Sequence, residues 1–443
     1  MLINIYKVGL ILSLVSGQCF DTPSPQLGRQ SLRYVECGNI NTPPLKVKTT
    51  TNKQLTGGKT QSNKTKDGMI EIDLTCTTAE STCNMVMDTF VTASDYLTNI
   101  IKFNTPIRIQ ATFTSFCTNM NDCDKVHQTL GQARVTRYHQ LRGDDGKVRL
   151  YPQALVKQIS QSAKKTSFHE SDILADFNSD ANFYFQSQGG KISNQQSDFL
   201  FVVSHELIHG LGFASLYNDY FSESTPTALF PNPQTATYND GTAKISNFFE
   251  SVFDKHVILT SNKRTLSSIT EVINGYISSN KDKTFKNEDL AYQNFIDSSQ
   301  YQVAKDLLQT AQTDGSMEFV FNTTSKVPFN SLVLETNLKP YSPSSSVSHV
   351  ALKNYQNSKD FLMKYEMSPG SSLSKLVASI GGGNWDTAPY GPGLIAVLET
   401  MGYPTNQNPH PNVIAGPANS ANFSKNIPSV LLVSLILTYF YLM

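Results

Sequence analysis

Two histidines and a glutamate lie close together in an uncharged, apolar segment, in the order His205, Glu206, His209. If this segment is a helix, residues four apart lie on one face a single turn apart, so both imidazoles face the same point. Two such imidazoles can bind one zinc ion, which lowers the pKa of a bound water to about 7. Glu206 lies close enough to take the proton from that water. The pattern predicts a hydrolytic Zn²⁺ site with Glu206 as the catalytic base.

The residues around the motif favour a buried helix, because they are uncharged and mostly apolar. Two histidines and a glutamate on a buried helix need a reason to be there, since polar groups are costly to bury. Gly210 and Gly212 are suited to end the helix and to turn the chain back toward the metal. The alternative, that these side chains are hydrogen-bonded core residues, is less favoured.

A catalytic zinc needs a third protein ligand and leaves its fourth position open for water. An extended His-Glu-x-x-His-x-x-Gly-x-x-His pattern would place a histidine at position 215, where the chain has Ser215. Glu250 is one candidate, because with Asp254 it forms the Glu-x-x-x-Asp pattern of thermolysin-like proteases. The other candidates are the remaining histidines, His127, His139, His169, His256, His349 and His410.

His349 has the most informative surroundings. It lies in Ser348-His349-Val350 and is followed by Phe361-Leu362-Met363 and by an apolar segment, residues 391–403, that ends in Met-Gly-Tyr. With the His-Glu-x-x-His-Gly-Leu-Gly-Phe segment, this order of motifs resembles the leishmanolysin-like metalloproteases. They are a branch of the metzincin zinc proteases, with members that carry a glycosylphosphatidylinositol (GPI) anchor. The resemblance covers residues 196–213 and 346–404.

The resemblance implies a role for each matching residue. His205, His209 and His349 would be the zinc ligands, Glu206 the catalytic base, and Met363 the methionine beneath the metal. It therefore favours His349 over Glu250 as the third ligand. Tyr365 would be a weaker candidate for binding the oxyanion or the metal, as a related tyrosine does in some metzincins, and plain packing is the favoured interpretation for it.

The periodicity of the chain predicts the elements that must position these residues. Apolar residues alternate with polar ones in residues 70–74 and 107–113, as in half-buried strands, and recur at helical spacing between Val86 and Ile101. Residues 171–186 predict another strand and turn. The expected fold is α+β and zincin-like, with a mixed sheet and the active-site helix in an N-terminal subdomain, residues 69–212. A mostly irregular or helical C-terminal subdomain, residues 213–412, would lie across a cleft, although residues 214–345 show no readable pattern.

The two ends of the chain read as targeting signals. Lys7 precedes an apolar run that ends near Gly17, so residues 1–17 are expected to be a secretory signal peptide. The C-terminal residues 413–443 combine small residues, a polar spacer and an apolar tail too short to span a bilayer comfortably. This order predicts a GPI anchor attached at Asn419 or Ser420, on the extracellular face of the plasma membrane.

The N-terminal part of the mature chain carries the marks of an oxidising compartment. Residues 18–68 contain cysteines and form a segment with a linker or exposed loop at 42–68, and they are a possible pro-segment. All six cysteines precede residue 124, which suggests three disulfides, and proximity favours Cys76–Cys83 and Cys117–Cys123. Asn63 and Asn322 lie in glycosylation sequons.

The composition excludes one class of partner. The chain has 36 basic and 36 acidic residues among 443, so it lacks the positive surplus that nucleic acids require. The expected function is a zinc endopeptidase at the cell surface. Its substrate would be a peptide or protein, and a lipid anchor would attach it to the outer leaflet of the membrane. An inactive surface or adhesion protein with the same scaffold and a non-peptide zinc hydrolase are the alternatives. The oligomeric state is not predictable from the sequence.

Overall fold

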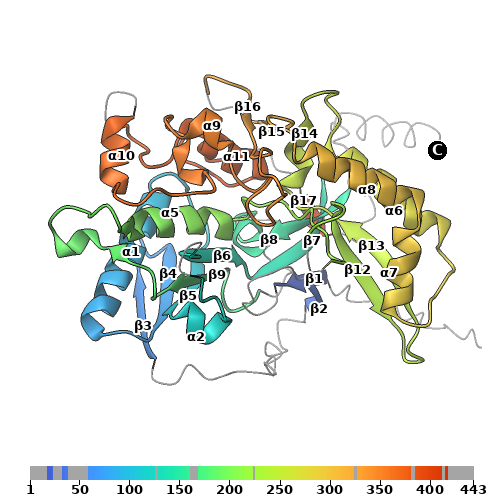
Figure 1. Cartoon of the computed structure of the whole chain (residues 1–443), viewed down its shortest axis with the longest axis horizontal. Coiled ribbons are helices and arrows are strands. Elements are labelled where there is room, and N and C mark those ends of the chain that lie inside the picture. Colours follow the sequence, from blue (N-terminus) through green and yellow to red (C-terminus); the bar gives the residue numbers. More distant parts are fainter. Residues whose placement is uncertain are drawn as a thin grey trace, which may run out of the picture.

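The computed structural model describes residues 17–22, 32–37, 58–124, 128–159, 168–222, 225–323, 327–380, 385–411 and 415–417. The fold is mixed α+β, as predicted, and Figure 1 shows several sheets with helices packed against them. Residues 1–16 of the predicted signal peptide and the predicted anchor sites Asn419 and Ser420 lie outside the described residues.

The central five-stranded sheet carries most of the predicted strands. Its order is β3-β4-β5-β9-β6, with β4, β5 and β9 parallel and with β3 and β6 antiparallel at the two edges. The strands are β3 (Lys59–Lys64), β4 (Ile70–Cys76), β5 (Ile107–Thr114), β9 (Ile173–Asn178) and β6 (Gly131–Val135). The prediction of a loop or linker at 42–68 was wrong for β3, whose exposed polar side chains give no alternating apolar pattern.

Two long helices pack on one face of this sheet. They are α1 (Glu80–Thr98), which connects β4 to β5, and α5 (Phe199–Gly210), which follows β9 in the chain after the short parallel pair β10 (Phe183–Tyr184) and β11 (Ser197–Asp198). The Phe199 ring lies 5.3 Å from the Phe177 ring of β9 and 6.3 Å from the Phe90 ring of α1. These edge-on aromatic contacts hold α5 against both the sheet and α1.

A second sheet joins parts of the chain that are far apart in sequence. Its order is β17-β7-β1-β2, and β8 also pairs with β7. The strands are β1 (Gly17–Asp21), β2 (Arg33–Cys37), β7 (Arg137–Gly143), β8 (Val148–Pro152) and β17 (Ala415–Pro417). Two short helices complete this part of the chain: α2 (Phe116–Met120) follows β5, and α3 (Gln153–Val156) follows β8. Strand β7 thus pairs with one strand near each end of the described chain.

The region without a readable pattern, residues 214–345, forms ordinary elements. It contains the hairpin β12 (Asn232–Thr237) and β13 (Ala243–Phe249), the helices α6 (Leu266–Ser279), α7 (Glu288–Ile296) and α8 (Ser299–Thr310), and the three-stranded sheet β14 (Val257–Leu259), β15 (Met317–Val320) and β16 (Ser331–Val333). The hairpin and helices extend to the right in Figure 1. This part therefore contains both helices and small sheets, where the sequence predicted only a mostly irregular or helical subdomain.

The remaining elements close the molecule over α5. They are the helices α9 (Leu352–Tyr355), α10 (Leu373–Ser379) and α11 (Pro392–Met401) and the single-turn 3₁₀-helices η1 (Gln186–Gln188), η2 (Asp254–His256) and η3 (Phe361–Met363). One hydrophobic cluster of buried residues runs from Ile70 to Tyr403 and includes residues from both predicted subdomains. Elements on the two sides of residue 212 consequently share a core.

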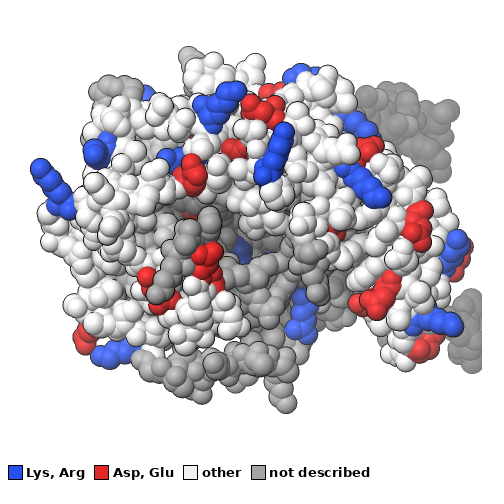
Figure 2. Space-filling model, viewed as in Figure 1, with Lys and Arg blue, Asp and Glu red and all other residues white. Residues whose placement is uncertain are grey.

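The surface and the disulfides agree with the composition. Basic and acidic side chains are interspersed over the face shown in Figure 2, where no large patch of one sign forms. The bonds Cys76–Cys83 and Cys117–Cys123 are present as predicted, Cys19 is also disulfide-bonded, and the described part of the chain has no free cysteine. Among the described helices, none is long and apolar enough to cross a membrane.

Candidate metal centre

Helix α5 is buried along nearly its whole length. All of its residues except His205, Glu206 and His209 are apolar or small, and only His209 is more than marginally exposed. A helix that is apolar on all sides is stable only inside a core, which is where the sheet and the C-terminal elements place it. The Asp198 carboxylate begins the helix, because one oxygen accepts from the Leu200 N–H at 2.9 Å and the other from the Leu373 N–H of α10 at 2.6 Å.

The C-terminal end of α5 turns the chain back toward the histidines. The Phe213 N–H donates to the Ile208 carbonyl and the Gly212 N–H to the His209 carbonyl, which is the hydrogen-bond pattern of a Schellman motif. Gly212 has a φ of +99°, and a Cβ at this position would lie 2.4 Å from Pro152. Glycine is therefore required here for both conformation and space. As expected from the sequence, the glycines end the helix.

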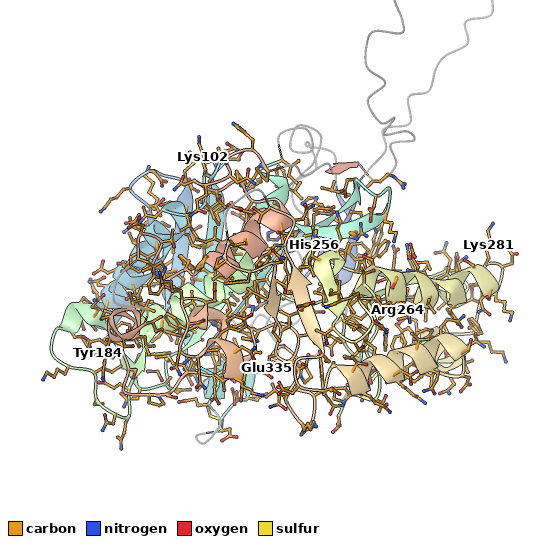
Figure 3. All side chains as sticks on the ribbon, turned by 90° about the horizontal axis from the view of Figure 1, so that it is seen from above. Lys102, Tyr184, His256, Arg264, Lys281 and Glu335 are labelled. Carbon is orange, nitrogen blue, oxygen red and sulfur yellow. A yellow bond between two sulfur atoms is a disulfide. The ribbon has the colours of Figure 1, made fainter. Side chains whose placement is uncertain are left out.

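His349 reaches the helix from the segment after β16. The Glu335 N–H donates to the His349 carbonyl at 2.8 Å, and the Val350 N–H donates to the Met363 carbonyl at 2.9 Å. Glu335, labelled in Figure 3, also accepts from the Leu352 N–H through its carboxylate at 3.0 Å. Backbone bonds on both sides of His349 thus fix its position between β16 and η3.

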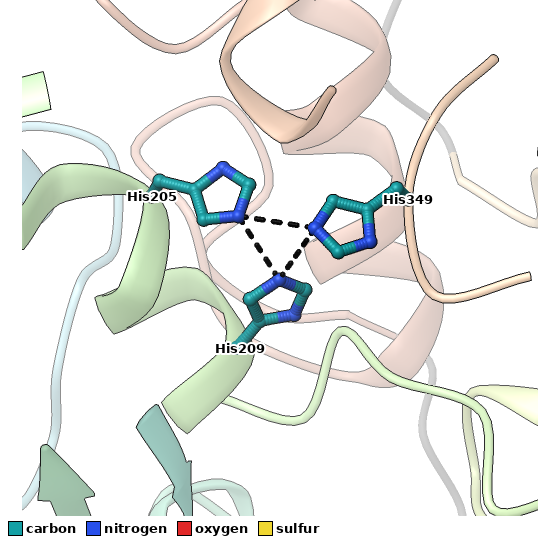
Figure 4. Close-up of side chains that lie close together, drawn as sticks. All are labelled: His205, His209 and His349. Carbon is teal, nitrogen blue, oxygen red and sulfur yellow. Dashed lines mark hydrogen bonds between the residues drawn. The ribbon is translucent and has the colours of Figure 1, made fainter. Parts of the chain in front are cut away.

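The structure brings His205, His209 and His349 together (Figure 4). Their Nε2 atoms form a nearly equilateral triangle with sides of 3.1, 3.2 and 3.2 Å. Three nitrogens that bind one tetrahedral zinc at about 2.0–2.1 Å lie about 3.3–3.4 Å apart. The triangle therefore has nearly the dimensions of three sites in a zinc coordination shell.

The other ring nitrogen of each histidine is bound to a backbone carbonyl. His205 Nδ1 donates to the Leu362 carbonyl at 2.7 Å. His209 Nδ1 donates to the Phe213 carbonyl at 2.7 Å, and His349 Nδ1 donates to the Ser345 carbonyl at 3.0 Å. A neutral imidazole carries one N–H, so these bonds leave each Nε2 with a lone pair directed at the other two. Three facing lone pairs repel one another unless a cation lies among them, and carbonyl-bound imidazoles are typical of metal ligands.

Burial keeps the three imidazoles neutral. It lowers the pKa of His205 to about 3, with a further contribution from His209, and that of His209 to about 4. The pKa of His349 also falls well below its usual value, first through burial and then through the two neighbouring histidines. Neutral imidazole is the form that binds metal, so the residues present fit a zinc ion.

Glu206 lies on the same helix, between the two imidazoles in sequence. One carboxylate oxygen accepts from the Ala133 N–H of β6 at 2.8 Å. Burial raises the pKa of Glu206 to about 8, although the hydrogen bond from Ala133 acts in the opposite direction. A carboxylate with a pKa near the working pH can both accept and return a proton.

Comparison with known proteins gives a family. Residues 19–418 match the model of the family described as SPBPB7E8-like. The chain belongs to this family. It is 27% identical over 347 residues to an uncharacterized protein of Schizosaccharomyces pombe, an alignment that covers 74% of this chain and 60% of that relative. The chain therefore spans about 60% of the relative's length, and no solved structure matches it.

The turn that carries Met363 lies directly against the site of this SPBPB7E8-like protein. Met363 is fully buried in η3, and the carbonyl of the preceding Leu362 holds the His205 ring. Tyr365 lies two residues further on and is half-buried, and its pKa is raised by burial and by the nearby Glu366 and Glu335. The turn thus connects helix α5 to the segment that carries His349. A role for Tyr365 stays a prediction.

Glu250, the alternative candidate for the third ligand, does not lie with His205, His209 and His349. Glu250 is buried elsewhere, where it accepts from Arg149 Nε at 2.5 Å and from the hydroxyls of Ser267 and Thr270. His256 packs against Phe319, with ring centroids 5.5 Å apart. The histidines that stay apart from the triad are His139, buried near Cys19, the partly buried His169 and the exposed His410, while His127 lies outside the described residues.

Two features of the site could not be recognised from the sequence. One is the edge strand β6, whose Ala133 N–H binds Glu206 and which shows almost no alternation of buried and exposed residues. The other is a link between Ser215 and Ser348. The Ser215 N–H donates to the Ser348 hydroxyl at 3.1 Å. The Ser215 hydroxyl donates to the buried Asp254 carboxylate at 2.6 Å. Position 215 thus supports the third histidine without being a ligand.

The two predicted glycosylation sites that are described are accessible. Asn63 lies exposed in the edge strand β3, and Asn322 lies exposed after β15. The hydroxyl of Thr323, within the second sequon, donates to the Glu399 carboxylate. Exposure is compatible with attached glycans at both positions.

Proposed function

We propose that this protein is a zinc-dependent endopeptidase that hydrolyses peptide bonds with the help of Glu206. The observation that carries the proposal is the convergence of three Nε2 lone pairs within 3.2 Å of one another, each fixed by a backbone carbonyl at the other ring nitrogen. His205, His209 and His349 would hold the zinc, which when bound polarises the peptide carbonyl and lowers the pKa of a water.

The chain's own residues would then handle the proton. Glu206 follows the first imidazole directly on α5, and its carboxylate is oriented by the Ala133 N–H. It would accept the proton from the attacking water and pass it to the nitrogen of the leaving amine. Its raised pKa of about 8 suits the first step, because a carboxylate of ordinary pKa is a weaker base and takes a proton from water less readily; the protonated group can still pass that proton to the more basic amine.

A zincin fold of the metzincin type belongs to the same proposal. Its support is the order of the elements: a histidine helix ended by Gly212, a third histidine far along the chain, and then a turn with Met363 whose backbone binds both segments. The resemblance to leishmanolysin-like proteases rests on these positions. The metal-free alternative for Met363, plain packing, fits its burial equally well.

We also propose that the enzyme acts outside the cell, held at the plasma membrane by a GPI anchor. The disulfides and the exposed sequons at Asn63 and Asn322 support an oxidising, glycosylating route. The last described strand, β17 (Ala415–Pro417), ends just before Asn419 and Ser420, so that an anchor at either residue would leave the folded body intact.

The test compares the wild-type protein with a Glu206→Gln variant. Glutamine keeps an oxygen for the Ala133 N–H but cannot accept a proton. Zinc content should therefore be unchanged, while cleavage of casein and of a broad fluorogenic peptide library should fall by about 10²–10⁴-fold. Equal cleavage rates would remove Glu206 from the mechanism. Zinc bound to a wild-type protein that cleaves no peptide would instead support an inactive surface protein or a non-peptide hydrolase.

A further inference from the structure

Lys364 lies beside the first histidine of the metal centre. It directly follows η3, whose Leu362 carbonyl accepts from His205 Nδ1. The Lys364 ammonium lies 5.9 Å from the centroid of the Phe201 ring on α5. The rings of Phe201 and His205 are nearly parallel, at 18°, with centroids 6.3 Å apart. A cation is thus held over the same helix face that carries the first imidazole.

Lys364 is partly buried but, unlike the partly buried Lys157 and Lys255, it is not paired with a carboxylate. Lys157 and Lys255 form ion pairs of 2.7 and 2.6 Å with Asp172 and Asp144. In the described part of the chain Lys364 makes no ion pair, and the acid that acts on it electrostatically is the exposed Glu366. Partial burial lowers the pKa of Lys364, which shows that part of its hydration is lost. An anion from outside the chain would compensate for that loss.

A positive charge beside the metal centre favours anionic groups. The Lys364 ammonium lies over the α5 face that carries the first imidazole. A cation in this position favours the approach and binding of anionic groups.

We propose that Lys364 binds a carboxylate of the peptide substrate, so that the enzyme prefers peptides with a carboxylate near the scissile bond. The carboxylate comes either from an acidic side chain or from a free C-terminus, since both present the same group to an ammonium. This inference rests on the proposed endopeptidase function and adds the substrate class to it.

A purely structural role for Lys364 makes a different prediction. A lysine can cover an aromatic ring with its aliphatic stem while its ammonium stays in water. In that case its removal would affect stability and would leave the selection among peptides unchanged. Lys305 is the control for this structural role, because its ammonium lies 5.3 Å from the ring of Tyr301 and both residues belong to α8.

The experiment measures how strongly the zinc-loaded enzyme discriminates a carboxylate from its amide. Peptides cleaved by the wild-type protein are made in pairs with Glu or Gln at each position near the scissile bond, and each with a free or an amidated C-terminus. The kcat/KM ratio within each pair is then compared among wild type, Lys364→Gln, Lys364→Arg, Lys364→Glu and Lys305→Gln. Zinc content of each variant shows that the site is folded.

In the wild type we expect a preference of about tenfold for the carboxylate, typical of a charge-assisted hydrogen bond. The ratio should fall to about one in Lys364→Gln, persist in Lys364→Arg and Lys305→Gln, and invert in favour of uncharged peptides in Lys364→Glu. The pair that shows the effect identifies the source, an acidic side chain or the C-terminus.

A wild-type ratio near one in every pair, or an undiminished ratio in Lys364→Gln, would overturn the inference while leaving the endopeptidase proposal in place. A wild-type enzyme that cleaves no peptide would overturn both.

Discussion

At the residue scale, the metal centre depends on three backbone carbonyls as much as on three histidines. The spacing of His205, Glu206 and His209 predicts the first part of the site, because a helix needs only local sequence to place them. His349 lies 140 residues beyond His209, and only the resemblance to a known family singled it out. The carbonyls that fix the ring orientations depend on tertiary structure, so no sequence pattern could reveal them.

The buried histidines make the metal-free protein sensitive to acid. In the unfolded chain a histidine titrates near pH 6.5, whereas burial lowers the pKa of His205 to about 3 and that of His209 to about 4. Between these values the unfolded chain binds more protons than the folded one, so stability should decrease as the pH falls below 6.5. Each such proton contributes about 1.4 kcal/mol per pH unit.

Urea unfolding in the presence of a chelator, at pH 7, 6 and 5, measures this dependence. The double variant His205→Gln, His209→Gln removes two of the titrating groups and should show a smaller loss of unfolding free energy across the same range. Parallel curves for the two proteins would contradict the account, because they would show that neither imidazole is held neutral by the fold.

At the element scale, the end of α5 connects the fold to the site. The left-handed Gly212 directs the Phe213 carbonyl back to the ring of His209, one turn earlier on the helix. The glycines after the histidines predict where the helix ends. They do not predict the close contact with Pro152, which comes from β8 in the second sheet.

Gly212→Ala should therefore weaken both stability and metal binding. The added Cβ would lie 2.4 Å from Pro152 in a backbone conformation that side chains disfavour, at a cost of about 1–3 kcal/mol. Displacement of the Phe213 carbonyl should lower zinc affinity by about 10- to 100-fold. Thermal unfolding and competition with a zinc chelator measure the two effects.

Gly275→Ala is the matched control. Gly275 lies within α6, and the nearest atom to an added Cβ is 3.8 Å away. Alanine in a helix interior is expected to raise stability by about 0.5–1 kcal/mol, with no change in zinc affinity. If Gly212→Ala behaved like this control, the helix end would have no part in holding the site.

At the scale of the whole molecule, local sequence patterns predicted single strands and helices but not the sheets that distant segments form together. Alternation and helical spacing located β4, α1 and β5, because each of these elements buries one face or stripe against the central core. Strand β9, which is buried on both faces, lies within the strand and turn predicted at residues 171–186. The exposed strand β3 and the second sheet escaped prediction, since the latter pairs β7 with β1 and β17 from opposite ends of the chain. Residues 214–345 likewise form short elements held by distant partners, such as β14 and β15.

The proposed metal centre requires that segments far apart in the chain meet around one ion. X-ray absorption at the zinc edge, combined with metal analysis of the purified protein, tests this most directly. We expect one zinc per chain with three imidazole nitrogens at about 2.0–2.1 Å. His349→Ala should lose most of the zinc, whereas His256→Ala should keep it. A wild-type protein without zinc, or a His349→Ala variant with its full zinc content, would contradict the account.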